Sequence, residues 1–196
     1  MKYKNLIKDH LSTSAEVKKS MIGQCIEVIE KISLLAADVY KKDGKVMLCG
    51  NGGSAADSQH IATELIVRLN SRLDRKALPA MALNTNTSTL TAAGNDYGFD
   101  SIFARQVEAF GRSGDLLVGI STSGNSANVI KAVQTAAELG VRTAGFLGGD
   151  GGKLKDLVDL ALIIPHTDTG MIQEGHITAG HIFCDIIERE LFIKND

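Results

Sequence analysis

The chain has 196 residues, of which 44% are hydrophobic and 22% are charged, and its formal net charge is −2. These values are typical of a globular domain with a sizeable core, and the near-neutral charge gives no sign of a general nucleic-acid or membrane-binding surface. The three cysteines are odd in number and stand among apolar residues, which favours reduced thiols over a disulfide framework. The first twenty residues are too polar for a signal peptide. We therefore expect a cytoplasmic protein.

Apolar residues recur at helical spacing from about residue 3 to residue 40, in two segments that break near residues 20–23. The second segment has the more regular stripe, formed by Ile26, Ile29, Ile32, Leu35, Ala36 and Val39. Such a helical pair buries its stripe either on one face of a sheet or against another subunit, and the sequence leaves both alternatives open. We expect residues 1–42 to form an N-terminal helical extension of a single domain whose core spans residues 43–196.

From Lys45 onward, apolar runs typical of buried strands alternate with helical runs. We expect strands at residues 46–49, 80–83, 116–120, 143–146 and 160–164. We expect helices at residues 54–69, 87–93, 101–110, 126–139 and 172–192. This alternation predicts a doubly wound α/β fold with a five-stranded parallel sheet, in which ligands bind beyond the carboxyl ends of the strands.

The stretch GNGGSAADSQHIATE, residues 50–64, follows the first expected strand. Its glycines and Asn51 form a turn in which the backbone can approach a ligand, and Ser54 stands at the expected N-cap of the next helix. A glycine turn before a helix N-terminus is a favourable anion site, because unpaired N–H groups and the helix dipole face the loop. His60 and Glu64 share one face of that helix, either as an exposed polar pair or as a metal or catalytic pair.

The glycine turn does not match a dinucleotide or ATP fingerprint, because the G-x-G-x-x-G spacing is missing and no G-K-[ST] follows. A small phosphorylated metabolite is therefore favoured over NAD or ATP. The segment STSGNS, residues 121–126, supports this interpretation, because four hydroxyl side chains at the start of a helix suit a phosphate monoester. An ordinary Ser/Thr turn with Ser126 as the N-cap needs only one of them.

The last expected helix adds further polar residues at the same rim of the sheet. Gln173 and His181 are eight residues apart and point to broadly the same side of this helix. With His60 and Glu64 they make a plausible four-ligand set for Zn²⁺, although glutamine is an uncommon zinc ligand and composition leaves the metal open. Alternatively, a histidine of this helix is an ordinary core residue, and His176 fits that description.

Four blocks of the chain stand out together: CGNGGSAADSQHIATEL, AAGNDYGFDSIFARQV, GISTSGNSANVIKA and IQEGHITAGHIFCDIIE. They resemble the phosphoheptose isomerases, also called sedoheptulose-7-phosphate isomerases, of the sugar-isomerase (SIS) domain class. The resemblance implies conversion of sedoheptulose 7-phosphate to D-glycero-D-manno-heptose 7-phosphate through an enediol(ate), the first step toward ADP-heptose for lipopolysaccharide or capsule. It also implies a homotetramer with active sites between subunits and one Zn²⁺ per subunit.

The same resemblance implies a role for each site residue. The phosphate would be held by Ser121, Thr122, Ser123 and Ser126. The sugar site would be lined by Asn51, Gly52, Gly53, Glu64, Asn95, Asp96 and Gln173. The metal would be bound by His60, Glu64, Gln173 and His181, with Glu64 and His181 as the acid/base pair. On their own residue types, Asn95 and Asp96 instead predict an ordinary turn.

Two alternatives come from other classes of protein. A non-catalytic SIS scaffold that binds the DnaA replication initiator shares much of the motif set, but IQEGH and NDYGF favour the isomerase. A sugar-phosphate sensor is disfavoured, because the chain shows no DNA-binding module and a His/Glu/Gln/His set is superfluous for sensing. A pull-down with the initiator distinguishes the scaffold from the enzyme.

Overall fold

The computed structural model describes residues 1–193. Two helices, α1 (Lys4–Gln24) and α2 (Ile26–Lys41), come before the sheet. The strands are β1 (Val46–Gly50), β2 (Ala80–Ala82), β3 (Leu116–Ser121), β4 (Arg142–Gly148) and β5 (Leu160–Ile164). The remaining helices are α3 (Gly53–Ile66), α4 (Thr87–Tyr97), α5 (Ala104–Phe110), α6 (Ala127–Glu138) and α7 (Thr169–Phe192). Within this described range, none of the helices combines the length and the hydrophobicity needed to span a bilayer.

The strands form one parallel sheet in the order β2-β1-β3-β4-β5, which confirms the predicted doubly wound architecture. Every residue of β1 and β3 is buried, and this explains why both strands read as continuous apolar runs. The chain moves from β1 to β2 on one side and then returns to β3 on the other side. A ligand crevice is therefore expected at the carboxyl ends of β1 and β3, where the direction of winding reverses.

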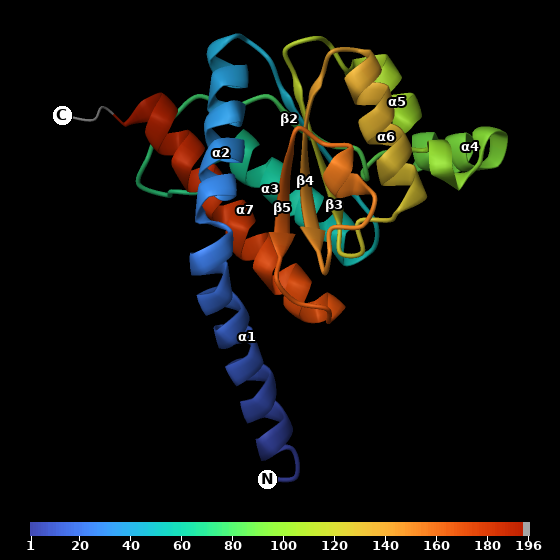
Figure 1. Ribbon diagram of the computed structural model, residues 1–196. Coiled ribbons are helices and arrows are strands. Elements are labelled where there is room, and N and C mark those ends of the chain that lie inside the picture. Colours follow the sequence, from blue (N-terminus) through green and yellow to red (C-terminus); the bar gives the residue numbers. More distant parts are fainter. Residues whose placement is uncertain (194–196) are drawn as a thin grey trace.

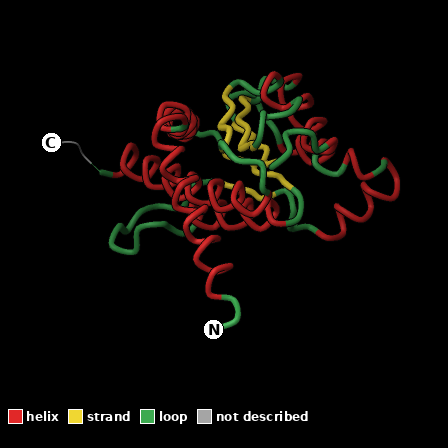
Figure 2. Tube along the Cα trace, turned by 60° about the horizontal axis from the view of Figure 1, so that its bottom comes forward, coloured by secondary structure: helices red, strands yellow, loops and turns green. Residues whose placement is uncertain are grey.

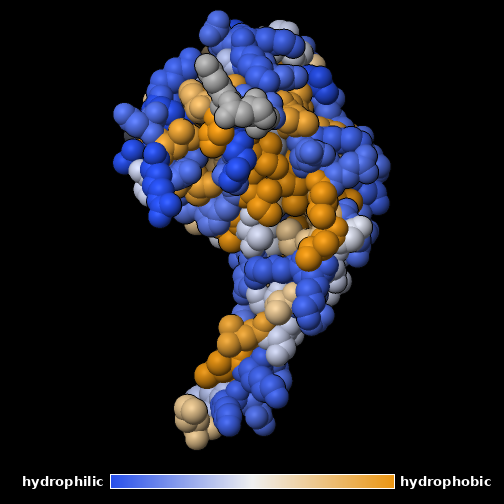
Figure 3. Space-filling model, turned by 90° about the vertical axis from the view of Figure 1, so that its left-hand side faces the viewer, coloured by the Kyte–Doolittle hydropathy of each residue, from blue (hydrophilic) through white to orange (hydrophobic). Residues whose placement is uncertain are grey.

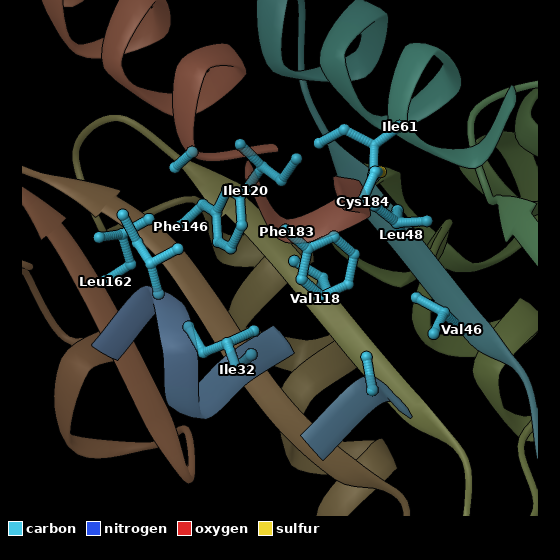
Figure 4. Close-up of a cluster of buried hydrophobic side chains, with 14 of the residues drawn as sticks. Ile32, Val46, Leu48, Ile61, Val118, Ile120, Phe146, Leu162, Phe183 and Cys184 are labelled. Atoms are coloured by element: carbon cyan, nitrogen blue, oxygen red, sulfur yellow. The ribbon is translucent and has the colours of Figure 1, made fainter. Parts of the chain in front are cut away.

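Helices cover both faces of the sheet, and Figure 2 shows the strands between them. On one face α2, α3 and α7 pack against the sheet. Helix residues such as Ile32 and Phe183 contact strand residues such as Leu48, Val118 and Phe146 there (Figure 4). On the other face the α5 and α6 side of the core contains Met47, Phe103, Val107, Leu117 and Val133. Neighbouring strand residues point to opposite faces, so Met47 and Leu48 belong to different halves of the core.

The boundaries of the first and last helices differ from the predicted ones in an informative way. The break between the first two helices falls at Cys25, because α1 continues through residues 20–23 without interruption. The last helix begins at Thr169, three residues earlier than predicted. The Asp168 carboxylate causes this early start, because it accepts a hydrogen bond from the backbone N–H of Met171 and caps the helix.

The first helix projects away from the rest of the fold (Figure 1). Its middle is anchored to α7 through Glu174, which accepts hydrogen bonds from Ser14 and from Lys18 Nζ (3.3 Å) and contacts His10 Nε2 (3.1 Å). Toward the N-terminus, the exposed apolar residues of the α1 stripe are Leu6, Ile7 and Leu11 (Figure 3). Thus α2 covers the sheet, as one of the two alternatives predicted, and the second half of α1 joins this core through Val17 and Met21, whereas Leu6, Ile7 and Leu11 face outward.

The three cysteines, Cys25, Cys49 and Cys184, are free and buried. Burial raises the pKa of the Cys49 thiol at the end of β1 to about 12. A thiol that stays protonated is a weak nucleophile, so Cys49 is a packing residue even though it directly precedes the glycine turn.

His176 is a core histidine, as the sequence suggested. Its ring is fully buried, its Nε2–H donates to the Leu147 carbonyl (2.9 Å), and Nδ1 has no partner among the residues that the structure describes. Burial lowers the pKa of His176 from 6.5 to about 4, only partly opposed by the hydrogen bond. Below pH 6.5 the unfolded chain therefore binds a proton that the folded chain excludes.

The lowered pKa of His176 predicts that acid destabilises the folded protein. The contribution of His176 to stability is complete above pH 6.5 and is lost as the pH falls toward 4. Between pH 7 and pH 5 we expect the free energy of unfolding to fall by about 2 kcal/mol more in the wild type than in a His176→Gln variant. Denaturant titrations of both proteins at the two pH values measure this difference. Parallel losses in the two proteins would rule out His176 as the source.

Candidate functional site

Helices α3 and α7 pack closely and carry the candidate site between them. Near the start of both helices, the Gln173 carboxamide lies against Gly53, in the place that a Cβ would occupy. Further along both helices, Ile61 packs on Gly180 in the same way. These two contacts show that the helices run in the same direction, and the two glycines let them approach each other. Both helices begin at the carboxyl edge of the sheet, where the crevice is expected.

Three polar side chains converge between these helices. His60 Nε2 lies 2.8 Å from His181 Nε2 and 3.4 Å from Glu64 Oε1. The ligand atoms of all three residues lie within 4.8 Å of one another. The His60 and Glu64 side chains are 44% and 20% exposed, so a small molecule can reach them. The structure therefore brings together His60, Glu64 and His181, which come from two helices more than 100 residues apart in the chain.

The chemistry of these donors fits a divalent metal ion. Two imidazole nitrogens and a carboxylate oxygen are ligands that Zn²⁺ takes in proteins. The two Nε2 atoms face each other, and a carboxylate oxygen of Glu64 lies beside them. One metal ion can therefore bind all three donor atoms. An imidazole and a carboxylate at one place are also the groups needed for general acid–base catalysis.

Asp57 is a further carboxylate close to this cluster. It stands one turn before His60 on α3, and its Oδ2 is buried without a hydrogen-bond partner among the described residues. Burial raises the pKa of Asp57, and the nearby His60 offsets part of this rise. The sequence analysis missed Asp57, although its spacing of three from His60 and seven from Glu64 places all three on one side of the helix.

The other polar residues of α7 have different surroundings. Gln173, the fourth predicted ligand, lies against Gly53, which is two turns of α3 before His60. It is therefore beside the glycine turn and not within the three-residue cluster. Glu174 points to α1, and His176 points into the core.

The glycine turn is built differently from the prediction. Ser54 is not the N-cap, because α3 begins at Gly53 and the cap position is Gly52, whose φ of +56° favours glycine. The Asn51 carboxamide exchanges two hydrogen bonds with that of Asn128 on α6, at 2.8 and 2.9 Å. This pair ties the turn after β1 to the helix after β3. Asn128 had no recognisable signal in the sequence, because only the fold brings it beside Asn51.

The hydroxyl loop, residues 121–126, follows β3. Ser126 occupies the N-cap of α6, but its hydroxyl bonds to Ser121 Oγ (2.9 Å) instead of capping the helix. Thr122 and Ser123 line a cavity of about 600 Å³ at the carboxyl ends of β3, β4 and β5. The other lining residues are Gly148, Gly149, Asp150, Pro165, His166, Thr167 and Ile172. The hydroxyl loop therefore presents donors to an open space, next to the unpaired N–H groups at the N-terminus of α6.

Asn95 and Asp96 lie apart from these groups. They belong to the last turn of α4, which extends four residues beyond the predicted end at residue 93. Both residues are exposed, and Asn95 Nδ2 donates to Asp96 Oδ1 at 2.7 Å. The predicted turn is thus a helix end, and α4 projects to the side of the molecule opposite α1 and α2 (Figure 1). Within one chain, the structure does not bring these residues to the His60 cluster.

Comparisons with a family model and with curated relatives identify the same family of proteins. A family model described as a SIS domain matches residues 9–148. The phosphoheptose isomerase of Clostridium acetobutylicum is 56% identical over 191 residues, covering 96% of this chain and 96% of the relative. That of Citrifermentans bemidjiense is 54% identical over 188 residues, covering 96% of this chain and 97% of the relative.

Two solved structures are similar over almost the whole chain. The phosphoheptose isomerase of Neisseria gonorrhoeae has a TM-score of 0.89 and 44% identity, covering 94% of this chain and 98% of that one. The phosphoheptose isomerase of Francisella tularensis has a TM-score of 0.92 and 34% identity, covering 96% and 100%.

Proposed function

The chain belongs to the phosphoheptose isomerase family of SIS domain proteins, and we propose that it converts sedoheptulose 7-phosphate to D-glycero-D-manno-heptose 7-phosphate. This reaction would supply the first intermediate on the way to ADP-heptose. The observation that carries the proposal is the convergence of His60, Glu64 and His181 between α3 and α7. The two helices that carry these residues and the hydroxyl loop all begin at the carboxyl edge of the sheet.

The reaction moves a proton between two adjacent carbons. Starting from the ketose, a base removes a proton from C1, and the C–H electrons form a C1=C2 double bond as the C2 carbonyl oxygen gains negative charge. Reprotonation at C2 and loss of the O1 proton then give the aldose. In our proposal Glu64 removes and returns the carbon-bound proton, and His181 transfers the proton between the two oxygens. An imidazole suits the second task because it can donate and accept at neutral pH.

The hydroxyl loop would hold the phosphate at the other end of the substrate. Its predicted donors are Ser121, Thr122, Ser123 and Ser126, together with backbone N–H groups at the N-terminus of α6. The helix dipole favours an anion at this place without a lysine or arginine. Asn51, Gly52 and Gly53 would line the sugar between the loop and the catalytic pair, and Asn95 and Asp96 would reach it from another subunit.

His60, Glu64 and His181 would hold a Zn²⁺ ion, with Gln173 as the predicted fourth ligand after a change of its side-chain rotamer. A bound ion would act as a Lewis acid that stabilises negative charge on the substrate oxygens, a contribution of several kcal/mol. The exposed α1 stripe, residues Leu6, Ile7 and Leu11, supports assembly into the predicted homotetramer. The cytoplasmic location remains a prediction from the sequence.

An assay with sedoheptulose 7-phosphate, with and without a chelator, tests this function. We expect aldose phosphate to form, the rate to fall at least about tenfold on chelation, and Zn²⁺ to restore it. A rate that chelation leaves unchanged would keep the isomerase and exclude a required metal. A folded, metal-loaded protein without turnover would overturn the proposed function and favour the scaffold that binds the replication initiator.

A further inference from the structure

A buried ion pair lies outside the site, between the end of α3 and the end of α7. Arg75 Nε donates to Glu188 Oε1 at 2.9 Å, and both side chains are only 1% exposed. The Phe192 ring covers the guanidinium, with 5.6 Å between the guanidinium carbon and the ring centroid. Burying two charges is costly, so such a pair is retained only where further hydrogen bonds satisfy it.

The arginine is bonded directly to the helix that carries the catalytic residues. Arg75 Nη2 donates to the backbone carbonyl of Glu64 (2.8 Å), and Nη1 donates to the carbonyl of Leu65 (2.8 Å). These carbonyls belong to the last turn of α3, which ends at Ile66 and cannot satisfy them within the helix. A cation at a helix C-terminus also interacts favourably with the helix dipole. Arg75 thus fixes the backbone of Glu64 itself.

The glutamate bonds to the segment that follows the same helix. Glu188 Oε1 accepts from Leu69 N–H (2.9 Å), and Oε2 accepts from Asn70 N–H (3.1 Å). Glu188 stands on α7 seven residues after His181, which is two turns, so both residues lie on the same side of that helix. One carboxylate therefore connects the end of α3 to the helix that carries His181.

We propose that Arg75 and Glu188 are positioning residues that hold Glu64 and His60 of α3 at their working distance from His181 of α7. This inference rests on the proposed function of the His60, Glu64 and His181 cluster. The close contact of Ile61 with Gly180 fixes the two helices near the cluster, and the ion pair fixes them beyond it. A site whose groups come from two helices, with His60 and His181 in direct contact, is sensitive to any slip between those helices.

A purely structural ion pair is the competing explanation, and the chain offers a matched control. Asp115 is 5% exposed and accepts from the backbone N–H of Lys45 (2.9 Å), from Lys45 Nζ (2.5 Å) and from the backbone N–H of Arg112 (2.8 Å). It resembles Glu188 in burial and in its number of donors. However, it lies at the start of β3 and its hydrogen bonds go to Lys45 and Arg112, so it contacts neither α3 nor α7.

The test compares Glu188→Gln and Arg75→Lys with Asp115→Asn in the full chain. Denaturant titration measures stability, Co²⁺ absorption spectra measure the affinity of the metal-free protein for Co²⁺ alone, and steady-state kinetics give kcat and KM. All three variants should lose stability. Only the Glu188 and Arg75 variants should bind Co²⁺ about tenfold or more weakly, with a fall in kcat larger than the rise in KM.

A double variant, Arg75→Met with Glu188→Leu, is used if the single variants do not fold. It removes both charges, a replacement that often preserves stability. It should still bind Co²⁺ weakly. Wild-type Co²⁺ affinity in the Glu188 variants, or an equal loss in Asp115→Asn, would overturn the positioning role alone. A wild type that neither binds Co²⁺ nor turns over substrate would overturn the proposed function and, with it, this inference.

Discussion

A Glu64→Gln variant is expected to fold normally and to lose turnover by about 10²- to 10⁴-fold, the contribution usual for a general base. Glutamine keeps the shape of the side chain and its hydrogen-bonding reach, but its carboxamide oxygen is not basic at neutral pH. The Glu64 side chain is 20% exposed beside His60, so the lost carboxylate is one that a substrate can reach. Turnover of sedoheptulose 7-phosphate at saturating substrate and saturating Zn²⁺ measures the effect.

Saturating metal matters because Glu64 is also a predicted metal ligand. If added Zn²⁺ restores most of the turnover, the carboxylate acts mainly in metal binding. If turnover stays low although the metal is bound, the loss belongs to proton transfer. Glu138→Gln, an exposed carboxylate at the end of α6, is the matched control and should keep wild-type turnover. Near-normal turnover in a folded Glu64→Gln protein would exclude Glu64 as the base.

The parts of the site that share one helix could be predicted from the sequence. The spacing of four between His60 and Glu64 places both on one face of any helix, and the apolar run before residue 50 identifies the strand that leads to it. His181 could be placed near this helix because its own helix also begins at the carboxyl edge of the same parallel sheet. These predictions depend on local periodicity and on one rule about sheet edges.

The contacts between distant segments could not be predicted in this way. Asn51 and Asn128 are 77 residues apart, and Arg75 and Glu188 are 113 residues apart, so no local pattern links them. Charged side chains are also expected at the surface, and nothing in the sequence near Arg75 indicates that its guanidinium is buried. The pairing of β1 with β3 brings the two asparagines together, and the packing of α7 against α3 brings Arg75 to Glu188.

The predicted start of α3 failed for a different reason. Serine is a strong N-cap residue, and propensity alone therefore favoured Ser54. The backbone instead turns through Gly52 at φ +56°, which starts the helix at Gly53 and leaves Ser54 buried inside it. Gly53 then leaves room for the Gln173 carboxamide. The positive φ of Gly52 thus sets the helix start, and the missing side chain of Gly53 allows the close approach of α3 and α7.

A Gly124→Ala variant is expected to lose about 2–5 kcal/mol of unfolding free energy and to bind substrate at least tenfold more weakly. Gly124 lies in the hydroxyl loop at φ +63°, a conformation that costs alanine energy. In addition, the new Cβ would collide with the backbone of Gly151 in the glycine-rich loop after β4. Moving either loop displaces the predicted phosphate donors, so KM should rise together with the loss of stability.

Gly149→Ala separates the two causes, because Gly149 has the same φ of +63° but no heavy atom within 4 Å of an added Cβ. This control should lose only about 1–2 kcal/mol, the cost of the backbone conformation alone. The difference between the two variants in denaturant titrations then measures the contact between Gly124 and Gly151. Equal losses would mean that the contact relaxes freely, and the hydroxyl loop would then depend little on the loop after β4. A larger loss for Gly124→Ala, accompanied by a higher KM, would mean that the two loops form one rigid support for the phosphate.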